Sequence, residues 1–132
     1  MTKEEKIEYW IQLSDEDLDV AKDLFVSKHW LYTGFMCHQA VEKILKAYWC
    51  STHEEAPQYT HNIIKIASDC GLSSQMSKEQ NKFIMDLMPL NIEARYPDYK
   101  NMIYKQLNVD KCQEIIANAN ALVAWIKEKI KY

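Results

Sequence analysis

The sequence has very few turn-forming residues, with two glycines and three prolines among 132 residues. Because Gly34 and Gly71 stand far apart, they cannot form a glycine-rich loop of the kind that cradles phosphate. The four cysteines are dispersed without a CxxC pair, which argues against the common zinc and redox motifs. No apolar run approaches membrane-spanning length, and the N-terminus MTKEEKIEYW lacks a hydrophobic signal core. We therefore expect a cytoplasmic protein with no membrane partner.

The residues that are abundant favour helices. Hydrophobic residues make up 48% of the chain and charged residues 27%, with ample Ala, Leu, Ile, Lys and Glu. The length suits one domain, residues 1–132, around a single core. A net charge of -3 argues against a surface that grips nucleic acid everywhere, although it leaves room for a local basic patch. Cys37, Cys70 and Cys112 fall at apolar-periodic positions, so we expect buried thiols in a reducing compartment.

Residues 32–49, YTGFMCHQAVEKILKAYW, predict the central helix of the fold. At 3.6 residues per turn, one wide apolar face contains Met36, Cys37, Ala40, Val41, Ile44, Ala47 and Tyr48. The opposite side carries the polar residues His38, Gln39, Glu42, Lys43 and Lys46. Two of the apolar residues, Ala40 and Ala47, are small enough for another helix to approach closely.

A first helix is expected to begin at the capping box that Thr2 opens. Its apolar stripe is interrupted by Ser14, where leucine would be expected. A short connection at 27–30 leads into the central helix, which predicts antiparallel neighbours. The central helix is expected to end near Ser51, before a loop that contains Pro57.

Three further helices are expected in the second half. The first is short, is capped by Thr60 or Asn62, and ends at Gly71. The next is opened by a capping box at Ser77, kinked or broken at Pro89, and ends near Arg95, since Pro97 disfavours helical geometry at Tyr96. The last follows Asn108 or Asp110. The sequence thus predicts an all-α fold of about five helices, an up-and-down four-helix bundle with an additional short helix.

The polar residues Gln39, Glu42, Lys43 and Lys46 form the first candidate site. Glu42 and Lys46 are a favourable i,i+4 pair. One interpretation is a solvated helix face. The other is the wall of a cleft in which the two lysines face a phosphate.

The second candidate site is the polar and aromatic segment around Pro97, with Glu93, Arg95, Tyr96, Asp98, Tyr99 and Lys100. One interpretation is a helix end closed by an Arg95–Asp98 pair, with the tyrosines half-buried. The other is a ligand-binding corner in which Arg95 grips phosphate, Tyr96 or Tyr99 stacks on a base, and Asp98 orients Arg95. The residues alone leave both interpretations open.

The four histidines do not form a recognisable catalytic or metal motif. His38 and Glu42 have metal-ligand spacing, but no HExxH pattern or further ligand joins them. His61, at the start of the third expected helix, fits a structural contact or cap better than a catalyst. No serine or cysteine nucleophile motif is present. We expect no metal, no cofactor and no catalytic residue of these types.

Five features of the sequence, taken in order, resemble the HEPN domain over nearly the whole chain. They are the aspartate-rich first helix, Tyr32, HQAVEKILKA at 38–47, a loop with Pro57 followed by THNI at 60–63, and ARYPD at 94–98. The resemblance implies a helical bundle of four to five helices and a homodimer, often with a cleft between the protomers. It also implies a nucleotide-binding role, or metal-independent cleavage of RNA. Small prokaryotic members frequently stand beside a minimal nucleotidyltransferase in toxin–antitoxin pairs.

The chain departs from the ribonuclease members at one point. Those members pair an arginine with a histidine a few residues further on. Arg95 matches the arginine, but Lys100, Asn101 and Met102 stand where the histidine should be, and no histidine follows His61. Cleavage through a 2'-hydroxyl needs a group that titrates near neutrality, so the family mechanism is not expected here.

Three hypotheses follow. The first is a non-catalytic, dimeric module that binds a nucleotide or polyphosphate through Arg95, Lys100, Lys43 and Lys46. The second is a restrained ribonuclease toxin, for which His38 and Tyr99 are the only replacement bases that the sequence offers. The third is a docking subunit for a nucleotidyltransferase. We favour the first.

Overall fold

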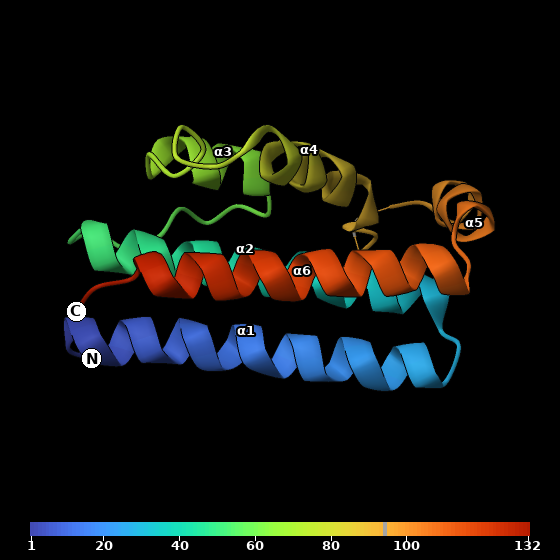
Figure 1. The fold of residues 1–132 in the computed structure, drawn as a ribbon, viewed down its shortest axis with the longest axis horizontal. Helices are drawn as coiled ribbons and strands as arrows, with labels where there is room; N and C mark the ends of the chain where they lie inside the picture. Colours follow the sequence, from blue (N-terminus) through green and yellow to red (C-terminus); the bar gives the residue numbers. More distant parts are fainter. Residues whose placement is uncertain (94) are drawn as a thin grey trace.

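The computed structural model describes residues 1–93 and 95–132, and within them the chain is entirely helical apart from its connections. Three long helices, α1 (Lys3–Val26), α2 (Trp30–Thr52) and α6 (Val109–Lys129), lie lengthwise beside one another (Figure 1). The short helices α3 (Ile63–Asp69) and α4 (Lys78–Leu87) and the 3-10 helix η1 (Met88–Leu90) cover α2 on the side away from α1. Helix α5 (Pro97–Gln106) packs near the end of the molecule where α2 begins.

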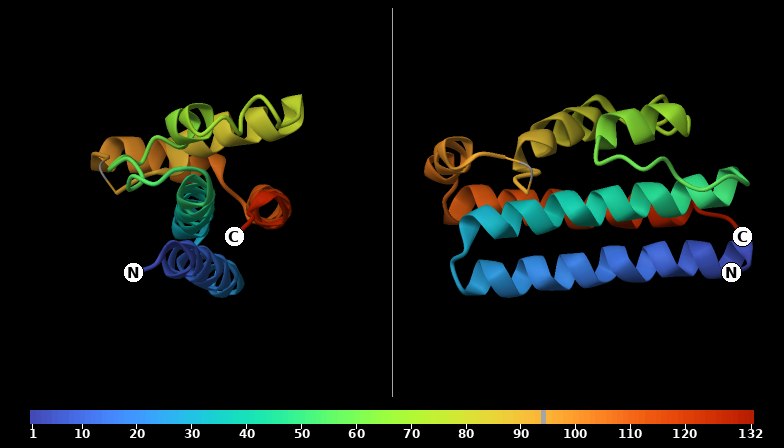
Figure 2. Two further views of the ribbon diagram at one scale, coloured as in Figure 1. Left: turned by 90° about the vertical axis from the view of Figure 1, so that its left-hand side faces the viewer. Right: turned by 180° about the vertical axis from the view of Figure 1, so that it is seen from behind.

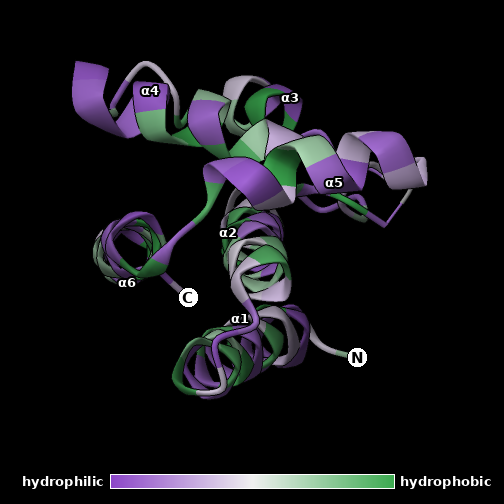
Figure 3. Cartoon of the chain, turned by 90° about the vertical axis from the view of Figure 1, so that its right-hand side faces the viewer, coloured by the Kyte–Doolittle hydropathy of each residue, from purple (hydrophilic) through white to green (hydrophobic). Residues whose placement is uncertain are grey.

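Helix α2 occupies the centre, as its sequence predicts. Seen along the long axis, it lies between α1 and the layer of short helices, with α6 beside it (Figure 3). Most of its residues are buried, including Ala40, Val41, Ile44 and Ala47. They form one core with the apolar stripes of α1 and α6. The views from the other sides show the short helices as a layer over α2 (Figure 2).

The expected helix starts are confirmed by their caps. Thr2 and Ser77 each form a complete capping box, and the Asn62 and Asn108 side chains accept from the third backbone N–H of α3 and α6. After α3, Gly71 adopts φ +78°, the left-handed conformation that glycine enters without steric cost.

The six α-helices of the described residues agree roughly with the expected count of about five, and the additional one is α5, which the sequence reasoning missed. Pro89 ends α4 at Leu87 and starts η1, so this helix does not reach Arg95. Pro97 disfavours helix before it, yet its fixed φ suits the first helical position, and it opens α5 with Tyr96 as the N-cap. Both α3 and α4 were expected, but α4 is shorter than the helix predicted to run to Arg95, and the two together occupy the fourth place of the bundle.

The buried polar and thiol groups complete the core. Ser14, the irregular position of α1, is fully buried and donates from Oγ to the carbonyl of Ala40 at 2.8 Å. All four cysteines are buried, and burial raises the pKa of the Cys37 thiol to about 12 and that of Cys112 to about 11. No helix in the described ranges is both long and apolar enough to cross a bilayer.

Candidate functional site

The polar side of α2 is not a solvated face, which removes the first of the two interpretations of these residues. His38, Glu42 and Lys46 are buried, while Gln39 and Lys43 are half-buried. The reason is that other elements pack on both flanks of this side. Glu42 bonds to His61, directly before α3, while Lys43 pairs with Asp17 of α1 and the Lys46 ammonium lies over the Trp10 ring of α1. Sequence periodicity registers the polarity of a face but not whether another layer packs on it.

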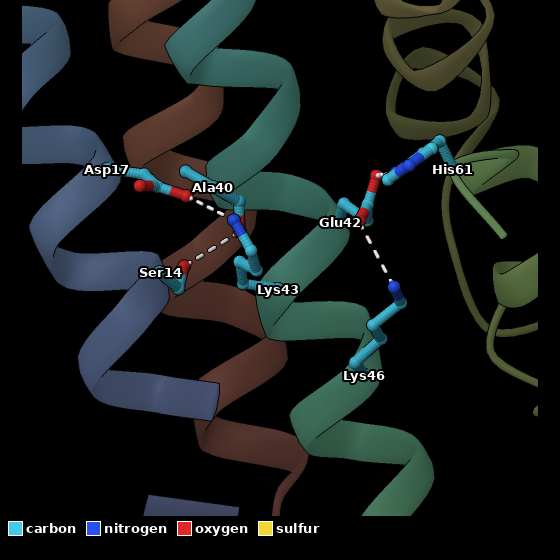
Figure 4. A network of polar contacts seen from close by, with 7 residues as sticks. All are labelled: Ser14, Asp17, Ala40, Glu42, Lys43, Lys46 and His61. Carbon is cyan, nitrogen blue, oxygen red and sulfur yellow. Dashed lines mark hydrogen bonds and ion pairs between the residues drawn. The ribbon is translucent and has the colours of Figure 1, made fainter. Parts of the chain in front are cut away.

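The charged groups of α2 are engaged in ion pairs that face different sides (Figure 4). Lys43 Nζ lies 2.7 Å from Asp17 Oδ2 of α1. Glu42 points the other way and accepts from Lys46 Nζ at 3.1 Å and from His61 at 2.9 Å. The two lysines therefore do not converge on one point, as a shared phosphate site would require.

His38 lies wholly inside the protein. Its exposed fraction is 0%, and neither ring nitrogen has a hydrogen-bond partner among the described residues. Burial lowers the pKa of His38 to about 4, with neighbouring Glu42 opposing the shift. The imidazole is therefore neutral near pH 7 and out of reach of a substrate, which removes it as a replacement base.

The segment before α5 presents an exposed arginine on an aromatic support. Arg95, the one arginine in the sequence, is exposed, and its guanidinium carbon lies 4.7 Å from the ring centroid of Tyr99. The Tyr99 hydroxyl in turn donates to the carbonyl of Pro89 at 3.5 Å. Among the described residues, no ion pair joins Arg95 to Asp98, so the tyrosine ring, and not the expected aspartate, supports the guanidinium.

The neighbours of Arg95 leave the start of α5 open. Tyr96 is 85% exposed and forms no side-chain cap with the described residues of the helix. Asp98 is exposed in the first turn, and Lys100 is half-buried. Ala94, the first residue of the ARYPD motif, lies outside the described residues.

The structure does not merge the two predicted groups into one cluster. No hydrogen bond or ion pair within residues 1–93 and 95–132 connects Gln39, Glu42, Lys43 or Lys46 to the segment around Pro97. Neither group lines the pocket of about 270 Å³ between α4, α5 and α6, which is surrounded by Phe83, Leu87, Leu90, Ile103, Leu107 and Ile115. In the described part of the chain, no three His, Cys, Asp or Glu side chains are placed to hold a metal ion.

Sequence reasoning missed the role of His61 as the partner of a buried carboxylate. His61 Nδ1 lies 2.9 Å from Glu42 Oε1, and the His61 side chain is 64% exposed, whereas that of Glu42 is 2% exposed. The two residues are far apart in the chain and no spacing rule links them. In the sequence, the one feature that pointed to a structural role for His61 was its position directly before Asn62, the N-cap of α3.

Comparison with known proteins gives the family. The HEPN domain model matches residues 7–130, nearly the entire chain. The chain belongs to the HEPN family. Among curated proteins, no sequence matches it significantly.

Two solved structures share the HEPN fold of this chain. TT1696 from Thermus thermophilus superposes with a TM-score of 0.77 at 18% identity, over 94% of this chain and 98% of that one. ST0689, described as an archaeal HEPN homologue, superposes with a TM-score of 0.76 at 22% identity, over 95% of this chain and 98% of that one. At these identities the similarity establishes the fold, and together with the family match it confirms the resemblance seen in the sequence.

Proposed function

We propose that this HEPN domain is a non-catalytic module that binds a nucleotide or other polyphosphate, with Arg95 as its principal phosphate contact. The observation that carries the proposal is the exposed Arg95 guanidinium held over the Tyr99 ring. A planar guanidinium that is stacked on an aromatic ring keeps its N–H groups available and loses little entropy when it binds phosphate in a bidentate manner.

Three features beside Arg95 support a nucleotide as the ligand. Tyr96 is 85% exposed, and its ring offers a stacking surface for a base. The start of α5 directs backbone N–H groups and the positive end of the helix dipole toward the same region. Lys100 stands in the second turn of α5 and adds positive charge. Lys43 and Lys46 are already paired with Asp17 and Glu42, so the proposal assigns them no phosphate contact.

The enzymatic alternative loses support from the positions of its two candidate bases. His38 is buried and neutral, and the Tyr99 ring lies beneath Arg95 while its hydroxyl bonds to Pro89. A ribonuclease component of a toxin–antitoxin pair would therefore need a base from elsewhere.

The proposal includes a homodimer. Several large apolar side chains remain exposed near the end of the bundle where α1 meets α2 and α5 meets α6, namely Val26, Tyr32, Met102, Tyr104 and Val109. Apolar groups gathered on one end favour burial against another chain. The same end could serve the runner-up function, docking to a nucleotidyltransferase, and the oligomeric state of the isolated protein separates the two.

The test is a thermal-shift screen with ATP, GTP, their mono- and diphosphates and short RNA. A ligand that binds only the folded state adds about 2.7 kcal/mol of stability at a hundredfold excess over its dissociation constant. We expect a shift with a nucleotide for the wild type and none for Arg95→Ala. Lys105→Ala, which removes a positive charge from the last turn of the same helix, is the matched control and should keep the shift. An equal shift in wild type and Arg95→Ala would remove the assignment.

A further inference from the structure

Another pocket lies at the end of the bundle where α1 begins and α2 ends, away from α5 (Figure 1). Its volume is about 380 Å³, which is within the range of sites that hold small organic molecules. The described residues that line it come from the first turns of α1, the last turn of α2 and the connection that follows α2. The pocket is therefore separate from the segment around Pro97, and the proposed phosphate contact does not involve it.

Uncharged side chains form the apolar lining of this pocket. Tyr9 and Trp10 of α1 meet edge to face, with their ring centroids 5.6 Å apart. Cys50 of α2, which is 4% exposed, and Pro57 of the connection complete this lining. Burial raises the pKa of the Cys50 thiol, although the nearby Lys6 charge and the Trp10 indole oppose the shift, so the thiol is uncharged near pH 7. The apolar lining thus offers two aromatic rings and no charge.

The connection that forms one wall of the pocket is fixed by contacts within the fold. Trp49 donates from Nε1 to the carbonyl of Glu55 at 3.0 Å, and its ring is stacked on that of His53 with the centroids 3.8 Å apart. Further along the connection, the Gln58 side chain donates to Asp69 of α3 at 2.6 Å. A wall that is already ordered loses little conformational entropy when a ligand binds.

Charged side chains of both signs border the apolar lining. Lys3 and Lys6 come from the beginning of α1, whereas Glu54 and Glu55 come from the connection after α2. Within residues 1–93 and 95–132, no ion pair involves any of these four side chains. The positive charges therefore belong to one wall and the negative charges to another, and neither pair neutralises the other.

We propose that this pocket binds a small aromatic zwitterion, of the class of the aromatic amino acids. The ring of the ligand packs on Tyr9 and Trp10, its carboxylate lies toward the two lysines, and its ammonium group lies toward the two glutamates. Exposed ion pairs each contribute little, so the aromatic contact supplies most of the affinity and the charges select the ligand. An aromatic molecule with only one of the two charges lacks one of these pairs and meets a like charge on one wall.

The test follows the indole N–H signals of the four tryptophans by NMR while L-phenylalanine is added to the wild type. We expect a saturable shift of the Trp10 signal and none of the Trp125 signal, because Trp125 lies on α6 outside the pocket. Tyr9→Ala should weaken binding about tenfold, because it removes one ring of the apolar lining. Tyr104→Ala removes a similarly exposed tyrosine from α5 and is the matched control.

Two analogues of phenylalanine test the role of the charges. 3-Phenylpropionate lacks the ammonium group and phenethylamine lacks the carboxylate, so each should bind about two- to fivefold more weakly than L-phenylalanine. Lys6→Gln should weaken the binding of L-phenylalanine and 3-phenylpropionate but not that of phenethylamine. Lys22→Gln, which changes an exposed lysine elsewhere on α1, is the control for this variant and should bind all three compounds like the wild type.

Each remaining outcome overturns part of the proposal. The site is overturned if the Trp10 signal shifts with none of the three compounds, or if Tyr9→Ala binds L-phenylalanine as tightly as the wild type. The zwitterion assignment is overturned if either analogue binds as tightly as L-phenylalanine. Cys50→Met fills the pocket from its buried side and should abolish the shift. If thermal unfolding shows that this variant is not folded, Tyr9→Ala decides the matter, because Tyr9 is 46% exposed.

Discussion

His38 is the residue whose chemistry conflicts most with its surroundings. Its imidazole is fully buried at the centre of α2, and both nitrogens lack a partner among the described residues. Burial lowers the pKa to about 4 from an ordinary value of 6.5, so the folded state takes up this proton later than the unfolded state as the pH falls. Acid therefore favours unfolding through this residue.

The free energy of unfolding should decrease as the pH falls from about 6.5 to about 4. Over this window the unfolded chain binds the proton and the folded chain does not, and a pKa difference of this size corresponds to about 3 kcal/mol. Urea unfolding at a series of pH values measures the slope. His38→Leu should flatten it, because leucine has no proton to bind.

The matched control is His29→Gln, which replaces an exposed histidine and should leave the slope unchanged. A slope that persists in His38→Leu would mean that other groups, chiefly carboxylates, produce the acid sensitivity. The pKa assigned to His38 would then be wrong.

Ser14 gives a second prediction at the scale of a single residue. Its buried hydroxyl donates to the Ala40 carbonyl at 2.8 Å, where α1 and α2 approach closely. Ser14→Ala should lower the free energy of unfolding by about 1 kcal/mol through the lost hydrogen bond. Ser14→Leu, the residue that the apolar stripe favours, should cost more, about 1–3 kcal/mol, because it overpacks this approach. Chemical denaturation of both variants gives the order, and a stabilising leucine would contradict the packing.

At the scale of elements, the sequence predicted those features that depend only on residues close together in the chain. The capping boxes at Thr2 and Ser77 and the apolar stripe of α6 depend on neighbours within a few residues, and they were predicted correctly. The burial of Glu42 and Lys46 was not predicted, because it depends on contacts with residues far away in the sequence, Trp10 of α1 on one flank and the layer of short helices on the other. Helix α5 was missed because Pro97 can either break a helix or open one, and only the chain direction after it distinguishes these cases.

The contact between α2 and η1 links packing to the proposed site. A Cβ at Gly34 would lie 3.1 Å from Leu90 Cδ1, and the neighbouring Pro89 carbonyl holds Tyr99 beneath Arg95. Gly34→Ala should be nearly neutral, because a gain in helix propensity of about 1 kcal/mol offsets the tight contact. Gly34→Val should lower stability by about 1–3 kcal/mol and weaken ATP binding, because η1 must move.

Urea unfolding and ATP titration of the same variants check this coupling. Leu90→Ala in the Gly34→Val background makes room for the new side chain and should recover part of the ATP affinity. Normal ATP affinity in Gly34→Val would show that η1 does not position Arg95.

At the scale of the whole molecule, we predict a homodimer whose interface includes the apolar end of the bundle. Val26 is 79% exposed at the end of α1, and Val109 is 48% exposed at the start of α6. A charge at either position should disfavour burial against a second chain, so Val26→Asp and Val109→Asp should shift the solution mass from dimer to monomer. Light scattering after size exclusion measures this mass.

Ile64→Asp is the matched control, since Ile64 is 41% exposed on α3, which lies toward the other end of the bundle (Figure 1). It should remain dimeric. A wild-type protein that is monomeric at micromolar concentration would contradict the dimer, and a dimer that survives both valine variants would place the interface elsewhere.

The role of Arg95 is tested by the dissociation constant of ATP for the wild type, Arg95→Ala, Arg95→Lys and Lys105→Ala, measured under one condition. We expect the affinity to fall at least about tenfold in Arg95→Ala and less in Arg95→Lys, which keeps the charge but cannot form the planar bidentate contact over Tyr99. Lys105→Ala should bind like the wild type. Equal affinity in all four proteins, or no ATP binding by the wild type, would contradict the assignment of Arg95 as the phosphate contact.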